Sequence, residues 1–295
     1  MKVEGDRPRV NIEHVIYATG FSGRSENAGQ YAVLLAQYYG AKLIVAHAFH
    51  PSQAAIEAEA LSHHASLERE RNLARLAGLA ESLVSGEIQA EPRLLNGPVD
   101  QSVGSLAEEQ SPSLVVLSTS GAGRFQRTFI GSTADRILRS TRWPCFVCGP
   151  NVPPPAKDSI PFKRILYATD FSPAAVQAAV YAVSLAKDAG ANIDVLNVVP
   201  EKVIAHPQQI AELEERLHQQ LEKVVPAQAR EFCNPRTFVD VGNAHKQINE
   251  HIRQYAVDLL VIGVRKSSHL DLEMRTSGAF ALIAESPCPV LTVLG

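Results

Sequence analysis

The sequence predicts an α/β protein of two tandem doubly wound domains, each a five-stranded parallel sheet flanked by helices. The first observation is a repeat, because IYATGFS at 16–22 returns as LYATDFS at 166–172, an offset of 150 residues. The second is that short Val/Ile/Leu-rich runs alternate with helical patterns in both halves. The third is that runs such as LVVL at 114–117 are continuously apolar, as expected for strands covered on both faces. This alternation implies parallel strands joined by right-handed crossovers.

Further matches between the halves occur in the same order and define the domains. They are Gly97 with Gly242, Gly131-Ser132 with Thr276-Ser277, and Pro144-Cys145 with Pro287-Cys288. Between the halves, GPNVPPPAKD at 149–158 contains four prolines, which remove backbone donors and favour a stiff, extended spacer. We therefore expect a first domain over residues 1–150, a linker over 151–162 and a second domain over 163–295.

The elements of the first half follow from the pattern of apolar residues. The predicted strands are 14–19, 42–48, 88–95, 113–118 and 145–148, and the predicted helices are 25–39, 53–84, 99–109 and 131–140. The strands are short apolar runs, whereas the longest helix carries LERERNLARL at 67–76, an amphipathic pattern with one solvated face.

The second half repeats this order. Its predicted strands are 164–169, 192–199, 235–241, 257–263 and 289–294, and its predicted helices lie near 173–189, 207–225, 243–255 and 276–285. A second amphipathic helix, around LEERLHQQL at 213–221, again has a charged outer face.

Composition excludes several classes of function. Of the 295 residues 45% are apolar and 20% charged, and the net charge of −3 provides no positive field for nucleic acid or anionic lipid. No apolar run reaches the ~18 residues that span a membrane, and acids near the N-terminus are untypical of a signal peptide. Four cysteines do not make a disulfide framework in a chain of this length. We expect a cytoplasmic protein that binds neither nucleic acid nor membrane.

A candidate ligand loop follows the fourth strand of the first half. Ligands of open α/β sheets bind beyond the carboxyl ends of the strands, and residues 118–133 read STSGAGRFQRTFIGST at such an end. Small residues let backbone amides approach a ligand, Arg124 and Arg127 add positive charge, and Gly131-Ser132 opens a helix whose free amides favour an anion. The segment could hold a di- or triphosphate, or it could be a flexible surface loop.

Two common phosphate motifs are not present in this loop. Neither half contains the Gly-Lys-Ser/Thr ending of a Walker A motif. A dinucleotide fingerprint starting at Gly121 would need glycine at Gln126, and it would follow the first strand rather than the fourth. The sequence therefore supports neither a P-loop NTPase nor a nicotinamide dehydrogenase.

Three features together resemble the universal stress protein family. They are the spacing Gly-x2-Gly-x9-Gly-Ser/Thr after the fourth strand, the Ala-Thr-Asp end of a first strand, and a terminal Cys-Pro-Val strand. The two copies resemble tandem-domain members, and only the N-terminal ten residues and the linker fall outside the resemblance. It implies an adenine nucleotide alpha hydrolase-like fold that often binds ATP. It also implies halves that pair through their last strands as an internal pseudo-dimer, and it permits a homodimer.

Each half departs from the family pattern. In the first, Ser118 replaces the leading glycine and Gly20 stands in place of the aspartate that the resemblance puts near the nucleoside. In the second, Asp170 is present, but Lys266 and Thr276 replace two loop glycines. Two acids, Asp271 and Glu273, also enter that loop, where they would repel a polyphosphate. We therefore expect ATP, with Mg²⁺, in the first half.

The expected binding residues fall into three groups. The phosphate and ribose end comprises Ser118, Gly121, Arg124, Arg127, Gly131, Ser132 and Thr133, and the nucleoside end comprises Ala18, Thr19, His47 and Ala48. The second-half counterparts are Asp170, Val198, Gly263 and Ser277.

The sequence contains no assignable catalytic set. There is no Gly-x-Ser-x-Gly elbow, and the Cys145-x-x-Cys148 pair lies in a predicted strand rather than at a helix N-terminus. His245 and His251 are six residues apart, which does not suit adjacent metal ligands on one helix face. We expect a stress-response regulator that binds adenine nucleotide and acts through unidentified protein partners. An interaction scaffold without nucleotide and a slow ATPase stay open as alternatives.

Overall fold

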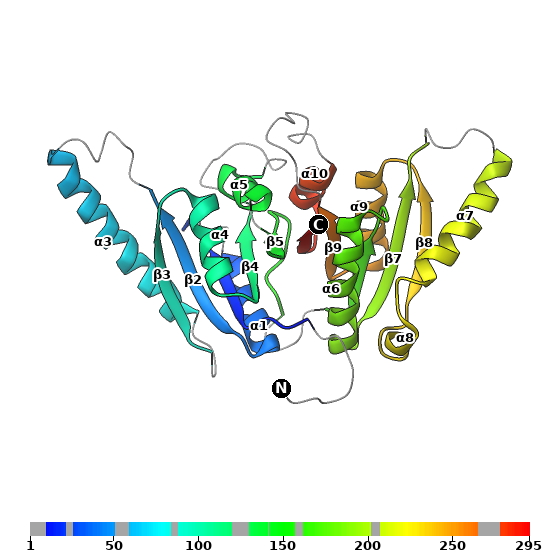
Figure 1. The fold of residues 1–295 in the computed structure, drawn as a ribbon, viewed down its shortest axis with the longest axis horizontal. Coiled ribbons are helices and arrows are strands. Elements are labelled where there is room, and N and C mark those ends of the chain that lie inside the picture. The colour runs from blue at the N-terminus through cyan, green and yellow to red at the C-terminus, as the bar shows by residue number, and fades with distance from the viewer. Residues whose placement is uncertain are drawn as a thin grey trace. The chain divides into compact units, whose positions relative to one another are not determined.

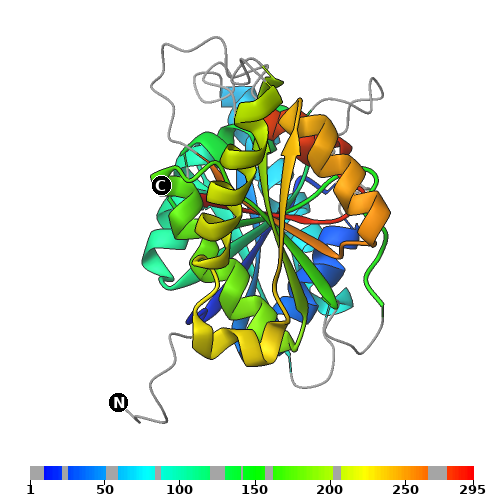
Figure 2. The same ribbon diagram turned by 90° about the vertical axis from the view of Figure 1, so that its right-hand side faces the viewer.

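The computed structural model describes residues 10–21, 26–50, 59–83, 88–119, 130–140, 142–156, 162–201, 207–264 and 278–295. The chain divides into two compact units. One comprises residues 12–159 and 266–290, and the other comprises residues 1–11, 160–265 and 291–295. In both, strands of a sheet are covered by helices (Figures 1 and 2). No helix in this part of the chain is long and apolar enough to cross a membrane.

The first half alternates strands and helices as expected. Its elements are β1 (His14–Ala18), α1 (Glu26–Tyr39), β2 (Lys42–Phe49), α3 (Glu59–Ser82), β3 (Ala90–Asn96), α4 (Val99–Glu109), β4 (Ser113–Ser118), α5 (Ser132–Ser140) and β5 (Cys145–Cys148). The strand order is β3-β2-β1-β4-β5, and all neighbouring pairs are parallel. Because the chain moves one way from β1 to β3 and then crosses to β4, the topological switch point lies between β1 and β4.

The second half has the same topology. Its elements are β6 (Arg164–Ala168), α6 (Pro173–Ala189), β7 (Asn192–Val199), α7 (Pro207–Glu222), α8 (Ala227–Cys233), β8 (Arg236–Val241), α9 (Ala244–Tyr255), β9 (Leu259–Val264), α10 (Gly278–Glu285) and β10 (Val290–Leu294). The order β8-β7-β6-β9-β10 repeats that of the first half. Figure 2 faces this half and shows α7 and α8 on one side of β8 and α9 on the other. The prediction of two tandem α/β domains is confirmed.

Local sequence explains where the helices start and stop. The side chain of Ser172 accepts a hydrogen bond from the amide of Ala175, and Pro173 occupies the first position of α6, where its missing donor costs nothing. Gly190 ends the helix with φ 61°, a left-handed conformation that glycine adopts without strain. On the sheets, Tyr17 and Tyr167 occupy equivalent buried positions of β1 and β6.

One predicted helix is wrong in its extent. The helix expected over 207–225 ends at Glu222, and a separate helix, α8, begins at Ala227. Pro226 stands immediately before α8 with φ −56° and ψ 147°. A proline lacks the amide needed to continue a helix and disfavours helical geometry in the residue before it, which explains the break.

A buried charge cluster distinguishes the second sheet from the first. Asp194 of β7 has no exposed surface, and both of its oxygens accept bonds from Arg236 on β8, at 2.9 and 2.8 Å. His251 of α9 lies 3.1 Å from Oδ2, and Arg164 of β6 lies 3.4 Å from Oδ1. The first half has buried Ile44 at the position of Asp194.

The cluster keeps the aspartate ionised. Burial by itself raises the pKa of Asp194, but the hydrogen bonds from His251 and Arg236 outweigh burial and lower this pKa below its ordinary value. The guanidinium of Arg236 also lies over the rings of Phe238 and Tyr255, at 5.2 and 4.8 Å. A bidentate, stacked arginine of this kind fixes β7 against β8 in one register.

Candidate functional site

The carboxyl edge of the first sheet gathers polar residues around its switch point. Ala18, the last residue of β1, pairs with Ala46 of β2 and with Leu117 of β4. Thr19 and Thr119, which follow β1 and β4, are therefore neighbours of the switch point, and both are buried. This edge is where ligands of open α/β sheets bind.

The turn after β1 is held in an unusual conformation. The hydroxyl of Thr19 accepts a hydrogen bond from the amide of Phe21, at 3.0 Å. The amide of Thr19 donates a hydrogen bond to the carbonyl oxygen of Ala46, at 2.9 Å. Phe21 has φ 57°, a conformation rare for a bulky residue. The second half repeats this turn, since Phe171 has φ 59° and its amide donates to Thr169 at 3.0 Å. Strain kept in both copies indicates that the turn serves a purpose beyond connection.

His47, near the end of β2, is bonded to the same turn. Its Nδ1 lies 2.8 Å from the carbonyl oxygen of Thr19. A carbonyl can only accept, so Nδ1 carries the proton. Burial lowers the pKa of His47, and the nearby charge of Arg75 lowers it further, while the bond to Thr19 acts in the opposite direction. The ring is thus neutral near pH 7, and its Nε2 is a hydrogen-bond acceptor.

Arg75 of α3 brings positive charge to this edge. Its guanidinium carbon lies 4.3 Å from the centre of the Phe21 ring, and that ring lies 4.3 Å from the ring of His47. The three side chains form a stack with a cation on its outer side. No sequence pattern indicates Arg75, since only the fold brings the middle of α3 to the end of β1.

The other side of the switch point is the start of α5. The amide of Gly131 donates to the carbonyl of Thr119 at 2.8 Å, which ties the beginning of the helix to the end of β4. Asp135 makes the first helical bond, to the carbonyl of Gly131, at 3.0 Å. Ser132 and Thr133 lie in the exposed first turn, whose amides have no partner within the helix. Such a turn favours an anionic ligand.

The structure brings most of the expected first-half residues to one edge. Ala18, Thr19, His47 and Ala48 lie at the ends of β1 and β2, and Ser118, Gly131, Ser132 and Thr133 lie at the end of β4 and the start of α5. Gly121, Arg124 and Arg127 lie outside the described residues, as does Ser277 of the second half.

The second half contains a related but different edge. Asn197 donates its side-chain amide to the carbonyl of Thr169 at 2.8 Å, the same bond that His47 makes with Thr19. One oxygen of Asp170 accepts a bond from the amide of Ser172 at 2.9 Å, so this carboxylate stabilises the turn before α6. Val198, the remaining second-half candidate in the described part, is a half-buried residue of β7.

Two glycines at the candidate edges have different surroundings. Gly263 lies against the backbone of Ala174 and Ala175, where a side chain would collide with the first turn of α6, so packing within the protein accounts for this glycine. Gly20 is the opposite case, because a Cβ placed there meets no atom within 4 Å. Gly20 follows β1 and corresponds to Asp170, whereas Gly263 lies in β9 and corresponds to Ser118, so the two glycines describe different strand ends.

The cysteines and histidines show no sign of redox or metal chemistry in the described part of the chain. Cys145 and Cys148 are both buried in β5, and burial raises the pKa of each thiol, which disfavours the reactive thiolate. In the ranges that the structure describes, no three His, Cys, Asp or Glu residues form a group that could hold a metal ion. His251 is committed to the Asp194 cluster.

Comparisons with known proteins give the family. The model of the universal stress protein family matches residues 11–149 and 161–293. No curated protein shows significant similarity. A universal stress protein from Archaeoglobus fulgidus is 19% identical over 95% of this chain and 96% of that chain, with a TM-score of 0.69. A putative universal stress protein from Pseudomonas aeruginosa is 14% identical over 96% and 93%, with a TM-score of 0.60.

A smaller match is to a universal stress protein solved in complex with cAMP. It is 20% identical over 47% of this chain and 97% of that chain, with a TM-score of 0.36. The family match covers both halves of the chain, each with the same strand order. The chain therefore belongs to the universal stress protein family, as a member with two tandem copies of its domain.

Proposed function

We propose that the first half binds an adenine nucleotide, ATP with Mg²⁺, at the carboxyl edge of its sheet, and that the protein acts through protein partners as a regulator in stress responses. The observation that supports this most is that an uncharged hydrogen-bonding surface and an anion-favouring helix N-terminus lie on opposite sides of one switch point. On one side lie Thr19 and His47, and on the other lies the open first turn of α5. A nucleotide has matching ends, an uncharged nucleoside and an anionic phosphate chain.

Each side can recognise its part of the ligand by ordinary hydrogen bonding. The unprotonated Nε2 of His47 would accept a hydrogen bond from a ribose hydroxyl or from the amino group of adenine. The first-turn amides at Ser132 and Thr133 would donate to phosphate oxygens, assisted by the helix dipole. Arg75 adds a positive charge on the nucleoside side.

The first half is the better candidate of the two. The loop that follows its fourth strand contains no acid, whereas Asp271 and Glu273 stand in the corresponding loop of the second half and would repel a polyphosphate. Nucleotide occupancy of one half would let the protein present different surfaces to partners in its two states.

Calorimetric titration of nucleotide-stripped protein with ATP and Mg²⁺ tests the proposal. We expect one site per chain in the wild type. Ser132→Asp should weaken binding at least about tenfold, because its carboxylate would oppose the phosphates yet suit the helix N-terminus, so folding is preserved. Ser132→Asn is the neutral control and should bind nearly as well as the wild type.

Three results would contradict the proposal. An absence of heat at millimolar ATP, together with an unchanged melting temperature, would favour a scaffold that works without nucleotide. Equal binding by Ser132→Asp and Ser132→Asn would place the phosphates away from α5. Two sites per chain would show that the second half binds as well.

A further inference from the structure

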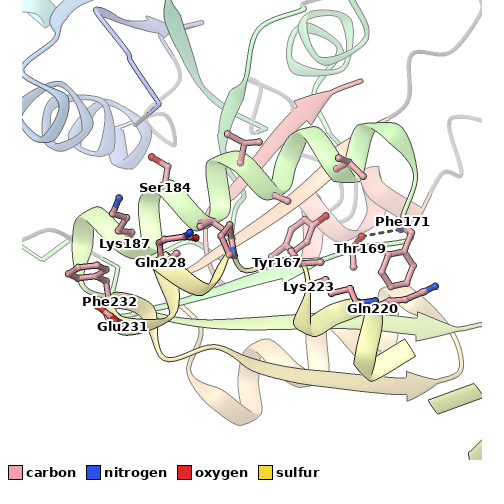
Figure 3. A pocket seen from close by; sticks show the side chains of 17 residues that line it. Tyr167, Thr169, Phe171, Ser184, Lys187, Gln220, Lys223, Gln228, Glu231 and Phe232 are labelled. Carbon is pink, nitrogen blue, oxygen red and sulfur yellow. Dashed lines mark hydrogen bonds between the residues drawn. The ribbon is translucent and has the colours of Figure 1, made fainter. Parts of the chain in front are cut away.

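The second half contains an apolar groove beside α6. The groove runs between α6 on one side and the end of α7 with α8 on the other, above Tyr167 and Thr169 of the sheet (Figure 3). Its volume is ≈ 940 Å³. Val176, Val180 and Phe232 line it and are 61%, 52% and 42% exposed, which makes them the three most exposed large apolar residues that the structure describes.

The corresponding place in the first half is not apolar on its surface. The repeat offset of 150 puts Glu26 and Gln30 of α1 at the positions of Val176 and Val180, and both are exposed. There, Leu83 also lies close to α1, with its Cδ2 3.3 Å from where a Cβ on Gly29 would be. The duplicated domain can therefore be stable with polar residues on this helix face, and the valines of α6 are not required by the fold.

The break between α7 and α8 opens the groove. In the first half α3 continues unbroken to Ser82, whereas α7 ends at Glu222 and the chain turns at Pro226 before α8. Val224 and Phe232, on either side of this turn, contribute to the groove wall. Tyr167 forms part of the floor, and its hydroxyl is satisfied by the backbone carbonyl of Ala175 at 2.5 Å.

Charge is unevenly distributed along the groove. Three charged side chains line it, Lys187, Lys223 and Glu231, and none of them forms an ion pair with another described residue. Figure 3 shows Glu231 at the same end as Lys187 and Phe232, whereas Lys223 lies toward the end with Phe171. Glu231 therefore offsets the charge of Lys187, and Lys223 is the better anchor for an anion.

The size of the groove favours a small molecule over a protein helix. A helical turn with its side chains fills roughly 400–600 Å³, given a 5.4 Å pitch and a 10–12 Å diameter, so about two turns at most would fit. Two turns are about 7 residues, whereas isolated helices shorter than ~12–15 residues are marginal in water, so a stable helix would extend beyond the groove. A volume of ≈ 940 Å³ lies instead within the range of small-ligand pockets.

We propose that this groove binds an amphipathic carboxylate, a medium- or long-chain fatty acid in its simplest form. The hydrocarbon chain lies against Val176, Val180 and Phe232, and the carboxylate lies beside Lys223. Binding covers apolar surface that is otherwise in water, and the charge of Lys223 orients the ligand. This site and its ligand class are independent of nucleotide binding by the first half.

Equilibrium dialysis of the full-length protein with radiolabelled dodecanoate, below its micelle concentration, tests the proposal. We expect saturable binding at one site per chain. The double variant Val176→Glu/Val180→Gln, which introduces the residues that the first half has there, should bind at least about tenfold more weakly, because it removes apolar surface and adds a like charge. Both positions are exposed, so the variant should fold. Leu67→Gln/Leu73→Gln on α3 removes a matched pair of exposed apolar residues elsewhere and should bind as the wild type does.

The charge of Lys223 is tested separately. Lys223→Gln should weaken dodecanoate about two- to fivefold, as expected for an exposed ion pair, and should leave binding of uncharged dodecanol unchanged. Absence of saturable dodecanoate binding to the wild type would overturn the proposal. So would undiminished binding by Val176→Glu/Val180→Gln, or equal losses for dodecanoate and dodecanol in Lys223→Gln.

Discussion

Gly20→Asp restores in the first half the carboxylate that Asp170 provides in the second, and it is the sharpest test of the proposed nucleotide site. Gly20 is exposed and outside the left-handed region, and a Cβ there meets no atom within 4 Å. The turn around it is the same as that around Asp170, with matching threonine bonds and phenylalanine conformations. The substitution should therefore fold without strain and place the carboxylate at the edge of the sheet.

The expected gain can be worked out from hydrogen-bond energies. A hydrogen bond between a charged group and a sugar hydroxyl or base is worth about 1.5–3 kcal/mol, which corresponds to roughly 10- to 150-fold in affinity. Whether the carboxylate raises or lowers the affinity for ATP depends on which part of the nucleotide lies beside it. A carboxylate beside the nucleoside strengthens binding, whereas one beside the phosphates weakens it by repulsion.

Titration calorimetry with ATP and Mg²⁺, comparing the wild type with Gly20→Asp and Gly20→Asn, measures this gain. Asparagine is the matched control, because it has the same shape without the charge and should give the smaller improvement. Affinity that is unchanged in Gly20→Asp, or lower than in Gly20→Asn, would refute the placement of the nucleoside at the ends of β1 and β2.

Two further predictions concern stability. Asp194→Asn should lower the free energy of unfolding by about 2–3 kcal/mol, less than the usual cost of breaking a buried pair because the two arginines are 25% and 38% exposed; urea unfolding followed by circular dichroism measures it. Since the pKa of Asp194 is lowered in the folded state, its contribution is present above about pH 4 and is lost as the pH falls through the folded pKa, so variant and wild type should converge in acid, and a constant difference would contradict this reasoning. The folded pKa of His47 is also lowered, which means that the unfolded chain takes up a proton first as the pH falls below about 6.5 and the native state loses stability there. His47→Asn, which copies Asn197, should keep the bond to Thr19 and lose less stability between pH 7.5 and 5.5; identical pH profiles in thermal melts would show that His47 does not titrate as inferred.

Much of the fold could be predicted because its signals are local and occur twice. Apolar runs bounded by polar residues place most strands within one or two residues of their observed ends, as for 113–118. The helix expected over 207–225 ends three residues early, at Glu222, and the short helix α8 that follows Pro226 was not predicted. The groove beside α8 was missed with it, because its wall depends on that break.

The site could be predicted in outline only. Thr19 and His47 were selected from their places at strand ends, but the bond between them depends on the register of β1 with β2. Arg75 and the charge cluster around Asp194 lie far along the chain from their partners, so no pattern of spacing points to them. Gly263 matched the ligand loop by sequence, yet its observed neighbours are backbone atoms of α6.

The salt-linked strands β7 and β8 bear on how a duplicated chain folds correctly. Two similar halves in one polypeptide invite strands of one copy to pair with those of the other, a characteristic failure of repeat proteins. In the native registers Asp194 lies opposite Arg236, and its first-half equivalent Ile44 lies opposite Glu91. If β3 took the place of β8 beside β7, the buried Asp194 would lie opposite Glu91. If β2 took the place of β7 beside β8, Arg236 would lie opposite Ile44. The cluster therefore favours the correct pairing of β7 with β8, because among these pairings only that one places Asp194 and Arg236 opposite a residue of the other charge.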